Sequence, residues 1–126
     1  MSKPESIMID DQKYIRADAV NKEAPSVNGM NCCVIRSYGA GVFCGYVKEQ
    51  KIDLNGVNVV LINSRRVHYW DGACSLSQLA MEGSKKLDNC RIAMVVTEQF
   101  IANVIEIIPM TAKAVDNIMG AKAWKS

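Results

Sequence analysis

The stretch MNCCVIRSYGAGVFCGYVKEQ, residues 30–50, decides the fold. Two β-rich runs, 31–37 and 42–49, flank the short segment 38–41, which reads Tyr-Gly-Ala-Gly. Its two glycines supply the positive-φ freedom that a tight connection between strands needs. The stretch therefore predicts a β-hairpin at the start of the main body of the protein.

The next segment, KIDLNGVNVVLINSRRVHYW (51–70), extends this β pattern. Asn55-Gly56 is a strong type I′ turn signal, and it predicts a second hairpin. The run 57–62 is apolar on both faces, which is typical of a central strand. Asn63-Ser64 is predicted to break the run before a further strand, Arg65 to Trp70.

Two short helices are expected later in the chain, with two apolar runs between them at 90–96 and 102–109. In SLSQLAMEG, Ser75 and Gln78 fit a capping box, and Gly83 stands where a helix ends. Thr111 is expected to cap the second helix, which Gly120 closes. The sequence thus predicts an α+β fold: a small, strongly curved antiparallel β-sheet or partial barrel with two short helices.

The first 29 residues differ from the rest of the chain. SIMIDDQKYIRADAV (6–20) has the pattern of a small β-hairpin, and NKEAPSVNG (21–29) is polar, contains Pro25 and ends in Asn-Gly. We therefore expect an N-terminal hairpin arm and linker at 1–29 and a single α+β domain at 30–126. Because such a hairpin lacks a core of its own, it is expected to pack on a neighbouring copy in a homo-oligomer.

Composition narrows the possible function classes. The 126 residues are 49% apolar and 22% charged, with a net charge of +2, which is too small to favour binding to duplex DNA. No signal peptide or membrane span is expected, so the protein should be cytoplasmic. The five cysteines show neither zinc-ligand spacing nor a disulfide pattern. We expect them to be small buried side chains and expect no metal site.

Catalytic signatures are weak. His68 is the only histidine, and its sequence neighbours offer only Asp71, a turn residue, to orient it. There is neither a phosphate-binding glycine loop ahead of a helix nor a dinucleotide fingerprint. The protein is therefore expected not to be an enzyme and to need no cofactor, although a His68-based enzyme and a structural or assembly protein stay open as alternatives.

Binding has better material, because cationic and flat side chains cluster in two of the predicted strands. Arginine grips phosphate and stacks on bases, while tyrosine and tryptophan offer flat apolar faces. On a strand, Arg66, His68 and Trp70 would share one face, and Arg65, Val67 and Tyr69 the other. The candidate ligand-binding residues are Arg36, Tyr38, Arg65, Arg66, His68, Trp70 and Arg91. The alternative is that Tyr69 and Trp70 are core residues and the arginines cover the sheet edge. The expected core includes Phe43, Leu61, Ile92, Val95, Ile105 and Ile107.

Three segments carry a resemblance to a known family. VIRSYGAGVFCGYV, LINSRRVHYWDGACSLSQLAMEGS and IEIIPMTAKAVDNIMGAKAWK resemble a family of short bacteriophage-encoded proteins. The shared motifs are R-x-Y-x-A-G-V, A-R-R-[IV]-x-x-W-x-G-A-x-[ST]-L and [IV]-E-I-[IL]-P-x-T-x-K-A. This chain departs from them at Ser64, where alanine is usual, and by its extra cysteines.

The layout is also similar to that of the anti-Thoeris and related anti-defence sponge proteins. That resemblance implies a non-enzymatic homo-oligomer that sequesters a cyclic nucleotide or a cyclic ADP-ribose-type immune signal in the host cytoplasm. The alternative is a small-barrel module that binds single-stranded nucleic acid or a protein partner.

Overall fold

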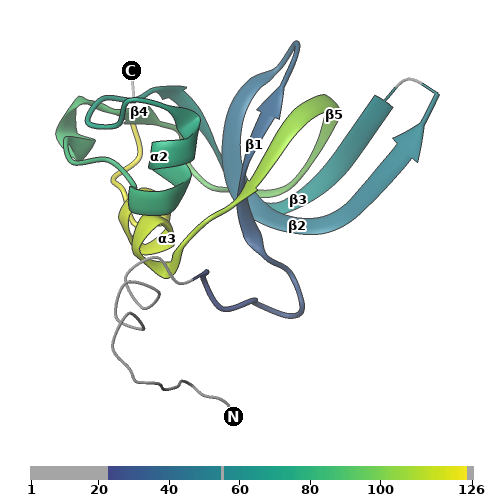
Figure 1. Cartoon of the computed structure of the whole chain (residues 1–126), viewed down its shortest axis with the longest axis horizontal. Coiled ribbons are helices and arrows are strands. Elements are labelled where there is room, and N and C mark those ends of the chain that lie inside the picture. Colours follow the sequence, from purple (N-terminus) through teal and green to yellow (C-terminus); the bar gives the residue numbers. More distant parts are fainter. Residues whose placement is uncertain (1–22, 55, 125–126) are drawn as a thin grey trace, which may run out of the picture.

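The computed structural model describes residues 23–54 and 56–124, and it confirms the α+β class. Figure 1 shows two short helices at one end and a long β-hairpin at the other. The strands are β1 (Cys32–Ser37), β2 (Gly41–Asp53), β3 (Gly56–Tyr69), β4 (Arg91–Ile92) and β5 (Val96–Pro109). The helices are α2 (Leu76–Glu82), the 3-10 turn η1 (Leu87–Asn89) and α3 (Ala112–Met119). The predicted N-terminal hairpin lies outside the described residues.

All strand pairings are antiparallel, and they close a ring in the order β1–β2–β3–β5–β1 without forming a regular barrel. The short strand β4 adds to β3 beside the start of β5. The predicted 38–41 turn is confirmed, because β1 ends at Ser37 and Gly41 begins β2 with φ +105°. Both helix caps are also confirmed, since Ser75 and Thr111 accept from the amides of Gln78 and Ala114.

The predicted break at Asn63-Ser64 is wrong, because β3 runs through it as one strand of 14 residues. Asn63 adopts φ +50°, and the register with β2 shifts at this level, so the chain bulges instead of ending the strand. β2 lies unusually close here: a Cβ at Gly45 would stand 2.8 Å from the Ser64 Cβ. Asparagine has a short polar side chain and tolerates the left-handed region. Asn63 therefore bends β3 at a point where the sequence pattern predicts that the strand ends.

The two apolar runs of the second half do not coincide with the strands. Within 90–96, Arg91–Ile92 forms β4 and Val96 begins β5, which continues through the second run to Pro109. Asn103, with φ +55°, bends β5, so that its first part pairs with β3 and its last part with β1. The Asn58 side chain accepts from the Asn103 amide at 3.3 Å, which fixes this bend.

The core has two parts, one on each face of β1. Cys32 and Val34 face α2 and α3, while Cys33 and Ile35 face the interior of the ring. Adjacent cysteines are useful here because a strand buried on both faces needs small apolar side chains in both directions. Burial raises the pKa of Cys33 to about 11 and that of Cys32 to about 12, so both thiols stay protonated.

Several predicted core residues behave as expected, and others do not. Phe43, Leu61 and Ile92 are buried, whereas Val95 and Ile105 are exposed. Val95 lies in the irregular segment between β4 and β5, and Ile105 follows Val104, which takes the buried position on this part of β5. The expectation that all five cysteines are buried is wrong in part, because Cys74 is exposed and Cys90 is half-buried. All five thiols are free.

Candidate functional site

The paired arginines have opposite environments although they are neighbours in β3. Arg65 is 2% exposed, and within the described residues its guanidinium donates to backbone carbonyl oxygens. The acceptors are the carbonyl groups of Ala93 (2.7 Å), Ala121 (2.6 Å), Ile118 and Met119 (3.2 Å each) and Ile92 (3.5 Å). Burial lowers the pKa of this guanidinium, which stays protonated because an arginine starts far above neutral pH.

Arg65 is thus a structural clamp and not a ligand-binding residue. It satisfies carbonyl groups at the end of α3 that have no partner within the helix, and it joins them to the segment after β4. Arg66 points to the other face, with its guanidinium carbon 4.7 Å from the centre of the Phe43 ring. The two arginines therefore point to opposite faces of β3, as their alternation along the strand predicts.

The predicted face assignment fails beyond Val67 because β3 bulges again opposite β4, where the register shifts between Val67 and Tyr69. Tyr69 is exposed beside Arg91, its partner on β4. Trp70 is half-buried and packs against the helix-side core, so it offers no free stacking face of the kind we expected. A one-residue bulge moves the following side chains to the opposite face of a strand. Here it places Trp70 on the buried face and Tyr69 on the exposed one.

His68 and Arg91 meet at a third side chain that the sequence analysis did not nominate, Trp124. The ring centres of His68 and Trp124 are 5.6 Å apart at an interplanar angle of 53°. The Arg91 guanidinium carbon lies 5.4 Å from the centre of the indole ring. The Trp124 amide donates to the carbonyl oxygen of Ile92 at 2.8 Å, which fixes the tail beside β4. Trp124 is 44% exposed, so part of its surface stays accessible.

A hollow of about 320 Å³ adjoins this tryptophan. Its lining combines η1 with the tail: Leu87, Asp88, Cys90, Gly120, Ala121, Lys122, Ala123 and Trp124. We call this hollow, together with His68 and Arg91, the Trp124 corner. Among the described residues, Lys122 and Asp88 are the charged members of the lining, and the Arg91 guanidinium lies against the Trp124 ring. The corner joins a flat ring to an excess of positive charge.

The loop behind the corner is held by a polar network around Asp71. The Asp71 carboxylate accepts from the Gly72 amide at 2.7 Å and from Asn89 Nδ2 at 3.1 Å. These two bonds, with a smaller contribution from Lys86, lower the pKa of the Asp71 carboxyl group. The Ser84 hydroxyl donates to the Asp71 carbonyl, and the Cys90 thiol donates to that hydroxyl at 3.3 Å. The corner is therefore built on an ordered loop.

The other predicted residues lie apart from the corner. Tyr38 is 85% exposed in the β1–β2 turn, and its amide donates to the carbonyl of Asn103. Arg36 forms an ion pair with Glu106, with 3.5 Å between the charged atoms. Of the seven candidates, only His68 and Arg91 share one cluster in the structure.

Trp124 and Lys122 were the residues that sequence reasoning missed. The sequence does show a tryptophan in a polar tail just after the glycine that ends the last helix. The residues next to it in sequence do not show where such a tail lies in the fold. In the part of the chain that the structure describes, no group of three histidine, cysteine or acidic side chains is placed to hold a metal ion. None of its helices is long and apolar enough to span a bilayer.

Residues 30–118 match the model of a family described as a domain of unknown function, DUF6948. The chain belongs to this family. Searches of curated proteins and of solved structures gave no match. The DUF6948 match includes His68 and Arg91 and ends before Lys122 and Trp124, so the corner combines residues from inside and outside the matched region.

Proposed function

We propose that this DUF6948 protein is a non-enzymatic binding protein for a small, flat anion of the nucleotide type, held at the Trp124 corner. The observation that carries the proposal is the placement of the Arg91 and His68 side chains against the partly exposed indole of Trp124. Lys122 adds a second positive charge at the rim of the adjoining hollow.

Each part of the corner suits one part of a nucleotide. Indole rings stack on bases of any sequence, and a guanidinium beside the ring can bind phosphate oxygens in a bidentate manner. The ordered Asp71 loop supplies a rigid wall, which lowers the entropic cost of holding a ligand. A lysine at the rim contributes a compact positive charge that attracts the phosphate group.

The finer part of the proposal concerns the kind of ligand. The similarity to bacteriophage proteins and to sponge proteins favours a cyclic nucleotide or a cyclic ADP-ribose-type immune signal, bound intact by a homo-oligomer in the host cytoplasm. A binding protein of this kind needs no nucleophile, and it acts by lowering the free concentration of the signal. Binding of single-stranded nucleic acid is the alternative, and it predicts a steep dependence of affinity on salt.

The test begins with purified protein that is heat-denatured so that any bound small molecule is released and identified by mass spectrometry. Cyclic nucleotides and cyclic ADP-ribose are then screened by thermal shift. A ligand at 100 times its dissociation constant adds about 2.7 kcal/mol of stability, which a melting curve detects readily. Release of an intact nucleotide supports sequestration, whereas a chemically altered product would contradict the non-enzymatic role.

Three substitutions locate the site, two of them a matched pair of arginine variants. Trp124→Ala should weaken binding about tenfold or more, because base stacking is worth about 1–3 kcal/mol. Arg91→Ala should also weaken it, while Arg36→Ala should not, because Arg36 lies on β1 and pairs with Glu106. Equal losses for the two arginine variants would refute the assignment to the Trp124 corner.

A further inference from the structure

A second hollow adjoins the Trp124 corner at η1. It has a volume of about 370 Å³ and is lined by Lys85, Lys86, Leu87, Asp88 and Asn89. Leu87 and Asp88 also line the hollow beside the tryptophan, so the two hollows meet at these residues. We call the second one the lysine hollow. The described residues that line it include two cations and no aromatic ring, so it suits a phosphate group better than a base.

The backbone of the two lysines is held in place. The Lys85 amide donates to the carbonyl oxygen of Gly72 at 3.2 Å, and the Lys86 amide donates to the Ser84 hydroxyl at 3.0 Å. A Cβ at Gly72 would stand 2.5 Å from the Lys86 nitrogen, so the two segments pack closely. Both lysines are exposed. Their side chains therefore extend into solvent from a fixed backbone.

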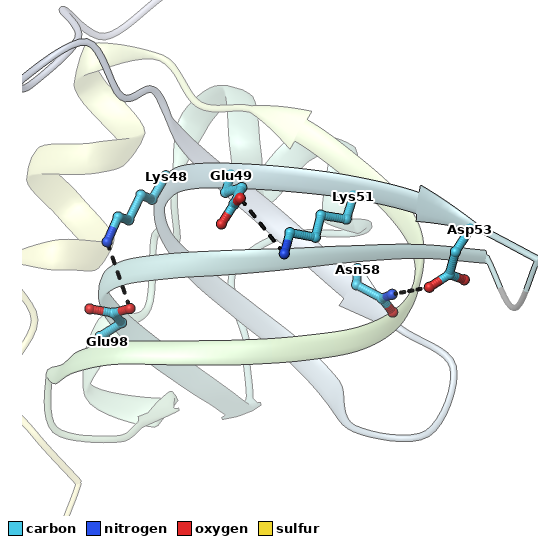
Figure 2. A network of polar contacts seen from close by, with 6 residues as sticks. All are labelled: Lys48, Glu49, Lys51, Asp53, Asn58 and Glu98. Atoms are coloured by element: carbon cyan, nitrogen blue, oxygen red, sulfur yellow. Dashed lines mark hydrogen bonds and ion pairs between the residues drawn. The ribbon is translucent and has the colours of Figure 1, made fainter.

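The charge of these lysines is available to a ligand. Figure 2 shows the opposite case on β2, where two lysines are paired with carboxylates: Lys48 with Glu98 at 3.8 Å and Lys51 with Glu49 at 3.9 Å. Within the part of the chain that the structure describes, neither Lys85 nor Lys86 forms such an ion pair. Lys86 does help to lower the pKa of Asp71, but that carboxylate takes its hydrogen bonds from Asn89 and Gly72.

Asp88 is the charged residue that the two hollows have in common. An ionised carboxylate only accepts hydrogen bonds, so it suits the hydroxyl groups of a sugar and repels a phosphate group. Acidic side chains bind ribose hydroxyls in this way in dinucleotide-binding folds. A nucleotide that lies across η1 would therefore place its ribose at Asp88, with a phosphate group farther on in the lysine hollow.

The volumes also favour a ligand that uses both hollows. Small-molecule pockets span about 300–1,000 Å³. The hollow beside the tryptophan, at about 320 Å³, is near the lower end of this range and is largely filled by a base and its sugar. The lysine hollow adds a space of similar size that such a nucleoside would leave empty.

We propose that the ligand is a nucleotide with two separate phosphate groups, the second of which binds Lys85 and Lys86. The inference rests on the proposed function, in which the base lies on Trp124 and the first phosphate binds Arg91. Each lysine ammonium group brings three N–H donors, so two of them can satisfy several phosphate oxygens at once. A nucleotide with one phosphate leaves the lysine hollow unused.

The experiment compares two ligands that differ by one phosphate group. Isothermal titration of the full chain at fixed ionic strength uses adenosine 3′,5′-bisphosphate and adenosine 5′-monophosphate, and then the two corresponding guanosine compounds. For the base that binds, the bisphosphate should bind about tenfold more tightly or better, because its second phosphate gains charge-assisted hydrogen bonds.

A double variant assigns this gain to the lysine hollow. Lys85→Ala/Lys86→Ala should lower the affinity for the bisphosphate about tenfold and should change the affinity for the monophosphate far less. Lys48→Ala/Lys51→Ala is the matched control, because it removes the same charge from the ion-paired lysines of β2. It should leave both affinities near the wild-type values. Circular dichroism checks that each variant keeps the fold.

The outcomes separate this inference from the proposed function. Equal binding of bisphosphate and monophosphate, equal losses for both ligands in Lys85→Ala/Lys86→Ala, or the same loss of bisphosphate affinity in the control would each overturn the inference alone. In those cases Trp124→Ala still weakens binding and the proposed function stands. Failure of all four nucleotides to bind the wild-type chain would instead count against the proposed function, and the inference would fall with it.

Discussion

The helix end and the hairpin end of this protein use the same strands in different ways. At the helix end, α2 and α3 cover one face of the sheet, and Arg65 satisfies the carbonyl groups at the end of α3. At the hairpin end, β2 and β3 continue with no helix over them, and Ile52 and Leu54 face solvent. The helix end is therefore held together by core packing and hydrogen bonds, whereas the hairpin end leaves apolar side chains exposed.

The largest expected difference between the two ends is the effect of a leucine-to-alanine substitution on the free energy of unfolding. Leu79→Ala, in the buried face of α2, should lower the free energy of unfolding by about 2–5 kcal/mol because it leaves a cavity. Leu54→Ala should change it by less than about 0.5 kcal/mol, because that side chain is fully exposed. Urea unfolding of dilute, monomeric protein measures both. Similar losses of unfolding free energy in the two variants would contradict the difference between the helix end and the hairpin end.

The two neighbouring arginines give the next largest effect. Arg65→Met should cost about 2–4 kcal/mol, because it leaves the part-buried carbonyl groups of Ala93 and Ala121 without their guanidinium donor. Arg66→Met should cost about 1 kcal/mol or less, since it removes one cation–π contact with Phe43. Chemical denaturation of both variants tests this, and equal losses would mean that the Arg65 clamp contributes little.

The clamp also makes a prediction at the Trp124 corner. Because Arg65 donates to Ala121, three residues before Trp124, its loss should release the tail. Tryptophan fluorescence quenching by iodide should therefore increase in Arg65→Met and stay near the wild-type level in Arg66→Met. An unchanged Arg65→Met would show that the bond between the Trp124 amide and Ile92 suffices to hold the tail.

A smaller effect is expected where β2 crosses β3, between the two ends. Gly45→Ala should cost about 1–3 kcal/mol, because the new Cβ would stand 2.8 Å from that of Ser64 and 2.9 Å from its Cα. Gly39→Ala is the matched control: no atom lies within 4 Å of a Cβ there, so little change is expected. Thermal unfolding of both variants compares them, and a neutral Gly45→Ala would show that the strands can separate at this bulge without loss.

Much of the fold could be predicted because it follows from local chemistry. The 38–41 turn, the caps at Ser75 and Thr111 and the burial of Phe43 each depend on residues close in sequence or on alternation along one strand. The bulges could not be predicted in this way. An asparagine with positive φ is equally compatible with a turn and with a bend inside a strand, and Asn63 and Asn103 are both bends.

The candidate site was harder to predict because its parts come from distant segments. Alternation correctly placed Arg65 and Arg66 on opposite faces, but it could not show which face the helices cover. His68 and Arg91 were nominated for their chemistry, yet the aromatic ring they share is Trp124, more than thirty residues after Arg91. Only the return of the tail to β4 brings these three side chains together.

The smallest expected effect is a pH dependence at the loop behind the corner. The pKa of Asp71 is lowered from 3.8, chiefly by the bond from Asn89 and then by the Gly72 amide, so the unfolded chain takes up this proton more readily than the folded one. The stabilisation is therefore complete above the unfolded value and is lost as the pH falls through the lowered value. Asp71→Asn lacks this contribution, so its deficit relative to wild type should be present at neutral pH and shrink on acidification toward about pH 3. Unfolding curves across this pH range measure the deficit, and a deficit that grew on acidification would reverse the assigned sign.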